Sequence, residues 1–232
     1  MLMGDEMKVI ASDFDNTLYV KEEKGLKENI EAVRNFISKG NIFIIITGRS
    51  FTNIKKVLNE YDIPYSYLVC QDGANLFDKD DNCMKRNALD FEKAQKIQNY
   101  LIEQNLEYSF ESAFNDQDTI DHATKITISV NNKEEALKKT EEIKKIVDVY
   151  AYVSSKHINI IDNYVNKCNA LKYLTENYYI SNDITVLGDD INDYEMLERY
   201  NGLIMKNHHK ILDQLNKKTI NSVSEYLNNI NE

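Results

Sequence analysis

The sequence predicts an α/β fold in which a doubly wound, mostly parallel, Rossmann-like sheet carries an inserted α+β unit. Short apolar runs at residues 8–14 and 42–47 do not alternate, which is typical of strands buried on both faces of a parallel sheet. A segment with helical spacing separates them, which indicates a βαβ unit. Within residues 79–159 the strands alternate and adjoin helices, which indicates a separate α+β layer.

The helix between the first two strands has clear boundaries. Ile30, Val33 and Ile37 recur at helical spacing and predict one buried face. Lys39 and Gly40 follow as a basic residue and a glycine, the residues that commonly end a helix.

A second helix and a third strand follow in the same rhythm. Ser50 is placed to cap a helix whose apolar positions include Ile54 and Leu58. Residues 67–70 predict the third strand, and the polar run at 78–82 predicts a turn.

The remaining elements divide the chain into a discontinuous core and an insertion. The insertion contains a helix with Phe91, Ala94, Ile97 and Leu101 on one face, an alternating strand over 125–130, a helix over 134–146, and strands over 147–153 and 157–161. The βα rhythm resumes with a helix over 169–177, a strand over 184–187 and a helix over 194–200. We therefore expect a core of residues 1–78 and 160–232 and an inserted unit of residues 79–159.

Composition excludes several classes of partner. The chain has 232 residues, with 28 Lys and Arg against 38 Asp and Glu, a formal net charge of −10. Such a surface repels nucleic acids and anionic membranes. The three cysteines are widely spaced, and no apolar run is long enough to cross a bilayer. We expect a cytoplasmic monomer or homodimer.

Two carboxylates stand at the end of the first strand, in the run Asp13-Phe14-Asp15-Asn16-Thr17. Open α/β sheets place their sites at this end of their strands. Both carboxylates would face one side of an extended strand, so they would repel unless a cation or a proton separates them. Mg²⁺ prefers such oxygen ligands, although an acidic turn is the plain alternative. Asn16 tolerates the left-handed φ that a sharp turn requires.

Three further polar motifs occur at strand ends or helix starts. Thr47-Gly48-Arg49-Ser50 combines a hydroxyl, a glycine amide and a helix N-terminus, which together can hold a phosphate. Lys167 opens a helix, and its positively charged ammonium group can lie against a phosphoryl group. Gly188-Asp189-Asp190-Ile191-Asn192-Asp193 supplies acidic groups after another strand. Each motif alone also fits an ordinary turn, cap or surface residue, but together they form a full set for phosphoryl transfer.

With these motifs, and with Asn166 before Lys167 and an Asp72-Gly73-Ala74 element, the chain resembles the haloacid dehalogenase superfamily of phosphohydrolases. The resemblance is greatest to the Cof-like branch with a type IIB cap. It implies a Mg²⁺-dependent phosphatase that hydrolyses a small phosphorylated metabolite, such as a sugar phosphate, through an aspartyl-phosphate. It also implies that residues 79–159 form the cap.

The resemblance implies a role for each motif residue. Asp13 would attack phosphorus, and Asp15 would protonate the leaving oxygen and later activate water. The catalytic residues would be Asp13, Asp15 and Lys167; the phosphate ligands Thr47, Gly48, Lys167 and Asn192; and the Mg²⁺ ligands Asp13, Asp15 through its carbonyl, Asp189 and Asp193.

Some residues depart from the family's pattern or match none of it. Asp72 stands where the family usually has asparagine, and Asp190 where it often has glycine. We expect Asp190 to face solvent and the four histidines to be structural or surface residues. Arg86, Tyr108 and Lys125 are candidates for cap residues that set specificity.

Three other functions fit parts of this pattern. A phosphomutase of the same superfamily would share the motifs and would require a bisphosphorylated activator. A phospho-receiver module also combines aspartates, threonine and lysine around Mg²⁺, but it is about half this length and needs no acid after the nucleophile. A catalytically inactive binding module would not need the intact motifs.

Overall fold

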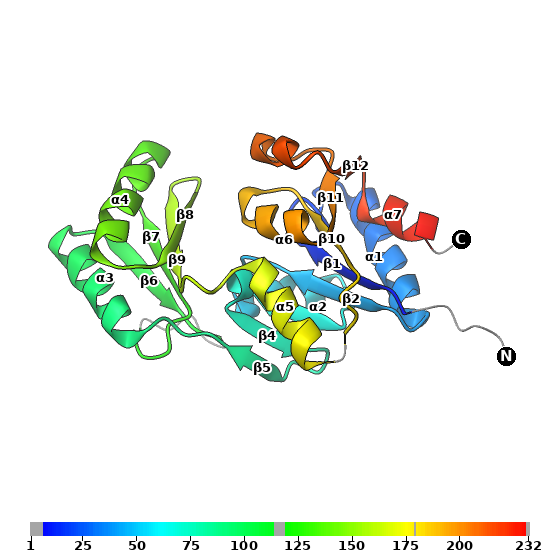
Figure 1. The fold of residues 1–232 in the computed structure, drawn as a ribbon, viewed down its shortest axis with the longest axis horizontal. Coiled ribbons are helices and arrows are strands. Elements are labelled where there is room, and N and C mark those ends of the chain that lie inside the picture. The colour runs from blue at the N-terminus through cyan, green and yellow to red at the C-terminus, as the bar shows by residue number, and fades with distance from the viewer. Residues whose placement is uncertain (1–6, 114–118, 179, 231–232) are drawn as a thin grey trace.

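The computed structural model describes residues 7–113, 119–178 and 180–230, and these residues form two sheets (Figure 1). The larger sheet has the strand order β12-β11-β10-β1-β2-β3-β4-β5, and the smaller has the order β6-β7-β9-β8. The other residues, which include parts of the predicted core and cap, lie outside the described ranges. The predicted α/β class is confirmed.

The larger sheet and its helices form what we call the core. Its strands are β1 (Val9–Asp13), β2 (Ile42–Ile46), β3 (Tyr67–Cys70), β4 (Asn75–Asp78), β5 (Cys83–Arg86), β10 (Ile184–Gly188), β11 (Asn201–Met205) and β12 (Lys218–Ile220). The strands from β12 to β3 run parallel, and β4 and β5 run antiparallel to their neighbours. Its helices are α1 (Glu23–Ser38), α2 (Phe51–Glu60), α5 (Lys167–Asn177), α6 (Tyr194–Arg199) and α7 (Val223–Ile230). In the described residues, no helix is long and apolar enough to cross a membrane.

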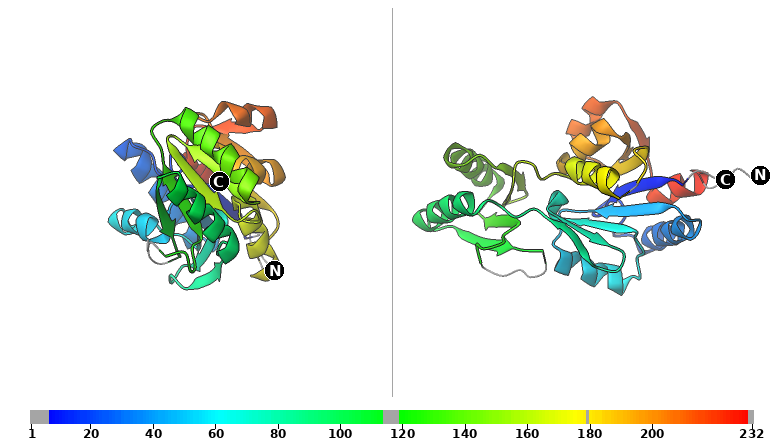
Figure 2. Two further views of the ribbon diagram at one scale, coloured as in Figure 1. Left: turned by 90° about the vertical axis from the view of Figure 1, so that its left-hand side faces the viewer. Right: turned by 60° about the horizontal axis from the view of Figure 1, so that its bottom comes forward.

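Both faces of the core sheet are buried under helices (Figure 2). Ile10 packs in a cluster with residues of α1, α2 and α7, whereas Val9 and Ala11 pack in a second cluster with residues of α5 and α6. Successive strand residues point to opposite faces, so each of these strands must be apolar throughout. This is why the runs at 8–14 and 42–47 do not alternate.

The smaller sheet and two helices form what we call the cap. It comprises α3 (Phe91–Glu103), β6 (Glu107–Glu111), β7 (Lys125–Ser129), α4 (Lys133–Ile146), β8 (Tyr150–Ser154) and β9 (His157–Ile161). Its two helices lie on the side of the sheet away from the core (Figure 1). Ile126 and Ile158 belong to the apolar cluster with these helices, whereas Lys125, Thr127 and Asn159 alternate with them and point the other way. The polar face of the cap sheet is therefore turned toward the core.

Three local features differ from the sequence expectations. The polar turn after β4 connects it to β5 in an antiparallel hairpin. The strand β5 therefore belongs to the core sheet, whereas the sequence predicted that this turn connects the core to the inserted unit. Phe91 is 48% exposed, because it is the first residue of α3 and lies before its buried turns. Ser50 holds the N-cap position of α2, but its hydroxyl makes no capping hydrogen bond. The division of the chain at residues 79 and 159 stays a prediction.

Replacing Gly202 by alanine should destabilise the protein. A Cβ atom there would stand 2.2 Å from the carbonyl oxygen of Leu197, so β11 and α6 would have to separate. We expect a loss of about 1–3 kcal/mol in the free energy of unfolding, measured by chemical denaturation. Gly25→Ala in α1 is the control and should be neutral or slightly stabilising. Equal stability of the Gly202 variant and the wild type would contradict the close packing.

Candidate active site

Neighbouring strands bring the predicted catalytic residues to one edge of the core sheet. The strand β1 ends at Asp13, and its parallel neighbour β10 ends just before Asp189. Lys167 is the first residue of α5, which packs over the same strands. Because parallel strands end at the same edge, residues 154 or more positions apart meet here.

The central contact of the site is a buried cluster around Lys167, whose side chain is 1% exposed. Its ammonium group donates to the carboxylates of Asp13 and Asp193, the latter at 2.6 Å. Burial alone would lower the pKa of Lys167, but Asp13 and Asp193 outweigh it and raise that pKa. Burial raises the pKa of Asp13 well above its ordinary value, although Lys167 opposes the shift.

Three buried carboxylates surround this one ammonium group. Asp13, Asp189 and Asp193 each offer an oxygen within 4.8 Å of the others. Burial, with the charges of Asp193 and Asp190, raises the pKa of Asp189 to about 6, although a hydrogen bond from Thr17 opposes the shift. Like charges at this distance are unfavourable unless a proton or a cation is bound.

This donor set fits a hard divalent cation. Asp13 and Asp189 present carboxylate oxygens, the ligand type that Mg²⁺ prefers. Asp193 accepts from Lys167 through one oxygen and from the amides of Asp189 and Asp190 through the other, at 2.9 and 3.0 Å. These bonds make Asp193 a support for Lys167 and for the loop after β10. Its assignment as a direct ligand stays a prediction, as does that of the Asp15 carbonyl.

Asp15 is paired with an arginine that the sequence alone did not assign. Arg49 donates to both oxygens of Asp15, at 2.8 and 2.5 Å. Its guanidinium also lies over the ring of Phe14, 5.1 Å from the ring centroid. These hydrogen bonds raise the pKa of Arg49. The chain turns sharply after Asp15, and Asn16 has the predicted left-handed φ, 62°.

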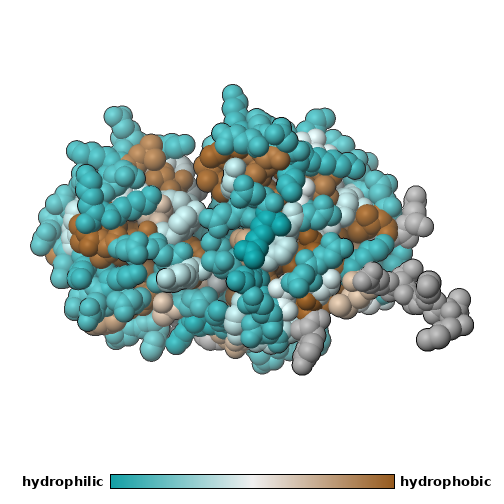
Figure 3. All heavy atoms as spheres, in the orientation of Figure 1, coloured by the Kyte–Doolittle hydropathy of each residue, from teal (hydrophilic) through white to brown (hydrophobic). Residues whose placement is uncertain are grey.

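A cleft of about 650 Å³ separates the core from the cap. Figure 3 shows a notch between the two units at the upper edge of the molecule. Its core side includes Asp13, Asp15, Asn16, Thr47, Gly48, Arg49, Asp189, Asp190, Ile191 and Asn192, and its cap side includes Lys133, Leu137, Tyr150, Tyr152, Val153, Ser154 and Asn159. The predicted phosphate ligands Thr47, Gly48 and Asn192 therefore lie on the same cleft as Asp13.

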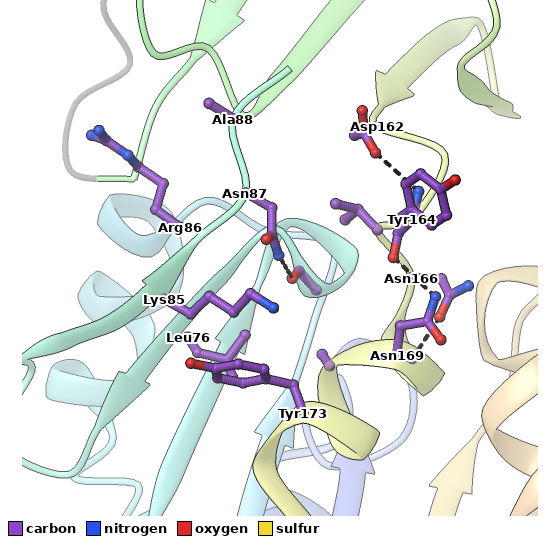
Figure 4. A pocket seen from close by; sticks show the side chains of 13 residues that line it. Leu76, Lys85, Arg86, Asn87, Ala88, Asp162, Tyr164, Asn166, Asn169 and Tyr173 are labelled. Carbon is purple, nitrogen blue, oxygen red and sulfur yellow. Dashed lines mark hydrogen bonds between the residues drawn. The ribbon is translucent and has the colours of Figure 1, made fainter. Parts of the chain in front are cut away.

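The predicted specificity residues of the cap lie in three different places. Lys125 donates to the carbonyl of Gly48 at 3.2 Å, at the edge of the cleft. The hydroxyl of Tyr108 instead accepts from Gln98, away from the cleft. Arg86 lines a separate cavity of about 430 Å³ beside the two segments that join the cap to the core (Figure 4).

This second cavity is lined by residues of β4, β5, the linking segments and α5, together with Gly73. Lys85 lies over the ring of Tyr173, with its ammonium 3.7 Å from the ring centroid, as Figure 4 shows. Its lining contains no residue of the three-carboxylate cluster. We therefore place the candidate active site in the cleft and not here.

Other expectations from the sequence agree with the structure. Asp190 is exposed and caps a short 3₁₀ helix, η2 (Ile191–Asp193). Among the residues that the structure describes, no histidine lines the cleft. His157 contacts Ser129, and His208 contacts Asp213, so both have local partners.

The contacts of the site that the sequence did not predict include three between described residues. Thr17 donates to Asp189, and Tyr152 donates to Asp72. The Asp15–Arg49 pair is the third. Thr17 and Arg49 stand within motifs and could have been singled out, but nothing in the local sequence of Tyr152 distinguishes it from other strand tyrosines.

Comparison with known proteins identifies the family. A sequence model of the haloacid dehalogenase-like hydrolases matches residues 10–116 and 110–226, nearly the whole chain. The chain belongs to this family. The resemblance that the motifs predicted is thereby confirmed.

Relatives of this haloacid dehalogenase-like hydrolase include named phosphatases. The phosphatase YwtE of Bacillus subtilis, named for 5-amino-6-(5-phospho-D-ribitylamino)uracil, is 33% identical over 100 residues. That alignment covers 43% of this chain and 34% of YwtE. YcsE of the same organism, which bears the same description, is 23% identical over 90% of this chain and 88% of its own length. These relatives place the chain among the phosphoric monoester hydrolases of its family.

Solved structures share the fold of this hydrolase. A haloacid dehalogenase-like hydrolase from Bacteroides thetaiotaomicron superposes with a TM-score of 0.82 at 16% identity, over 97% of this chain and 100% of its own. A subclass IIB sugar phosphatase superposes with a TM-score of 0.79 at 15% identity, over 97% and 99% of the two chains. The core and the cap therefore recur together in proteins of low sequence identity.

Replacing Asp189 by asparagine should stabilise the metal-free protein at neutral pH. The folded-state pKa of Asp189 is raised from 3.8 to about 6. Stability from its protonated form is therefore present at low pH and lost as the pH rises through about 6. We expect the variant to melt roughly a few degrees higher at about pH 7.5, with the difference closing toward about pH 4.

This comparison uses thermal unfolding in a chelator. With Mg²⁺ added, the wild type should melt at a higher temperature than the Asp189→Asn variant, because a bound ligand stabilises the folded protein and the variant lacks one carboxylate ligand. A difference in melting temperature that does not change with pH would contradict the raised pKa.

Proposed function

We propose that this chain is a Mg²⁺-dependent phosphatase that hydrolyses a small phosphorylated metabolite through an aspartyl-phosphate. The observation that carries this proposal is the buried Asp13–Lys167–Asp193 cluster, with Asp189 beside it, on a cleft that also holds Thr47 and Gly48. Phosphoryl transfer requires mainly positioning and charge neutralisation, and this site supplies both.

The carboxylate cluster supports the dependence on Mg²⁺. Asp13 and Asp189 would hold the ion, with the backbone carbonyl of Asp15 as a third ligand. When bound, the ion would neutralise charge on the phosphoryl oxygens and on the clustered carboxylates. Lys167 already neutralises part of that charge, since it contacts Asp13 and Asp193 together.

In the first step, an oxygen of Asp13 attacks phosphorus and forms a new phosphorus–oxygen bond. The bond to the leaving alcohol breaks, and Asp15 transfers a proton to the departing oxygen. Arg49 engages both oxygens of Asp15 in this structure, so at least one of these hydrogen bonds must be released. Thr47, the Gly48 amide and Asn192 would hold the phosphoryl oxygens during the transfer.

In the second step, the ionised Asp15 accepts a proton from water, and the water oxygen attacks phosphorus. The bond between Asp13 and phosphorus breaks, which releases inorganic phosphate and restores both carboxyl groups. The cap lies over the cleft and would exclude all water except the attacking molecule.

The chemistry of the cleft supports a polyol or sugar phosphate as the substrate class. The cap presents Tyr150, Ser154, Asn159 and Lys133 toward the site, which offers hydroxyl and amide groups to a hydroxylated leaving group. The named substrate of YwtE and YcsE carries a phosphorylated ribityl chain, and the subclass IIB neighbour is a sugar phosphatase. The substrates that these names describe are small phosphate monoesters.

Asp13→Asn should abolish hydrolysis. The amide is not a competent nucleophile, so we expect the rate to fall about a thousandfold or more. The measurement is Mg²⁺-dependent release of phosphate from p-nitrophenyl phosphate and from a panel of phosphorylated metabolites. No bisphosphorylated activator is added, which separates a phosphatase from a phosphomutase.

Asp62→Asn on a distant exposed loop is the control and should keep full activity. A folded Asp13→Asn protein with wild-type activity would exclude the mechanism.

Asp15→Asn should impair the hydrolysis of alkyl phosphates more than that of p-nitrophenyl phosphate. An alkoxide needs a proton to depart, whereas nitrophenolate is a stable leaving group. We expect kcat/KM for a sugar phosphate to fall about 10²–10⁴-fold, and kcat/KM for the aryl substrate to fall much less. Equal losses for both substrates would show that Asp15 does not act as the general acid.

A further inference from the structure

We propose that Asp72 is a positioning residue that ties closure of the cap to the geometry of the active site. It does so through two hydrogen bonds, one from Tyr152 in the cap and one from Asn192 in the loop after β10. We call these three residues the Asp72 junction. The proposal rests on the phosphatase function and adds to it a residue that the motifs leave without a role.

The backbone at Gln71 and Asp72 is bound to residues 47–49, which we call the phosphate-binding segment because the proposed ligands Thr47 and Gly48 lie in it. The amides of Gln71 and Asp72 donate to the carbonyls of Arg49 and Thr47, each at 3.0 Å. Gln71 and Asp72 have φ angles of 51° and 56°, in the left-handed region that residues with a side chain seldom adopt. Two such residues in succession persist only where their surroundings hold them. The turn and the phosphate-binding segment therefore form one hydrogen-bonded unit.

The carboxylate of Asp72 joins three parts of the molecule. It is 2% exposed, accepts from the Tyr152 hydroxyl through one oxygen, and accepts from the Asn192 amide at 2.8 Å through the other. A Cβ atom on Gly48 would stand 3.2 Å from the same carboxylate. The carboxylate therefore contacts the cap and the loop after β10 at once, and it lies beside Gly48.

The charge of Asp72 strengthens the hydrogen bond that Tyr152 of the cap donates to it. A buried carboxylate beside an anion-binding segment is costly unless hydrogen-bond donors surround it. Opening the cap would remove Tyr152 and leave the carboxylate with one donor fewer. Burial and Asp72 raise the pKa of Tyr152 well above its ordinary value, so its hydroxyl keeps the proton that it donates.

Other contacts of the cap converge on the same two core segments. Gln71 donates to Glu111 of β6 at 3.0 Å, and Lys125 of β7 donates to the Gly48 carbonyl at 3.2 Å. These cap residues lie on the polar face of its sheet. The cap is thus bound to the segments around Gly48 and Gln71, and Asn192 is aligned through the same junction.

A double-mutant cycle of Asp72→Asn and Tyr152→Phe tests the junction. Asparagine keeps the size of the side chain but can form only neutral hydrogen bonds, which are about half as strong. We expect each single variant to lower kcat/KM about tenfold, as for loss of a hydrogen bond to a charged group. The double variant should lose little more than either single one, because both changes remove the same interaction.

Tyr100→Phe is the matched control. This tyrosine is in α3 of the cap, and its hydroxyl also donates to a carboxylate, that of Glu142, away from the cleft. It should keep the wild-type kcat/KM and combine additively with Asp72→Asn. Additive losses in the Asp72→Asn/Tyr152→Phe cycle, or wild-type kcat/KM in both single variants, would overturn the proposal.

Amide hydrogen exchange gives a readout that does not depend on activity. We expect faster exchange in β8 and in residues 71–73 of the Asp72→Asn and Tyr152→Phe variants than in the wild type and Tyr100→Phe. Unchanged exchange in both variants would also overturn the junction. If the wild type hydrolyses no phosphate ester but the exchange difference is found, the phosphatase proposal fails while the Asp72 junction stands.

Discussion

One buried ammonium group organises the candidate active site of this protein. Lys167 contacts Asp13 and Asp193 from a position that is 1% exposed, and Asp189 adds a third carboxylate within the cluster. Burial, together with the neighbouring carboxylates, raises the pKa values of Asp13 and Asp189. Three carboxylates against one ammonium leave negative charge in this buried place. The order of the strands makes this cluster possible, because β1 and β10 are neighbours and their carboxyl ends lie together near the start of α5. A divalent cation is the natural complement to the charge that remains.

The cap completes the site by using the two faces of its sheet differently. Its apolar face packs on α3 and α4, whereas Thr127, Asn159 and Tyr152 face the core. An alternating strand normally turns its polar face to bulk water. Here that face covers a cleft, where its hydroxyl and amide groups can meet a substrate. Its contacts with Gly48 and with residues 71–72 place the same sheet against the segment that we propose binds phosphate.

Much of the core could be predicted from the sequence because its patterns are local. Apolar runs marked β1 and β2, and Lys39 with Gly40 marked the end of α1, where the structure places both. Unpredicted features depend on packing at a distance. That β5 belongs to the core sheet depends on the pairing of a hairpin, and that Arg86 lies outside the cleft depends on how the linking segments pass the core.

Local sequence patterns indicate which chemical groups the protein has, and that these groups follow strand ends or open a helix. Periodicity and motif spacing are properties of neighbouring residues, so they predict Asp13, Thr47 and Asp189 at strand ends and Lys167 at a helix start. How these groups are paired depends on contacts between distant parts of the folded chain. The bonds of Arg49 to Asp15 and of Tyr152 to Asp72 join residues 34 and 80 positions apart. Arg49 and Asp15 meet because β1 and β2 pair in the sheet, and Tyr152 and Asp72 meet because the cap packs on the core. Neither local sequence contains that geometry.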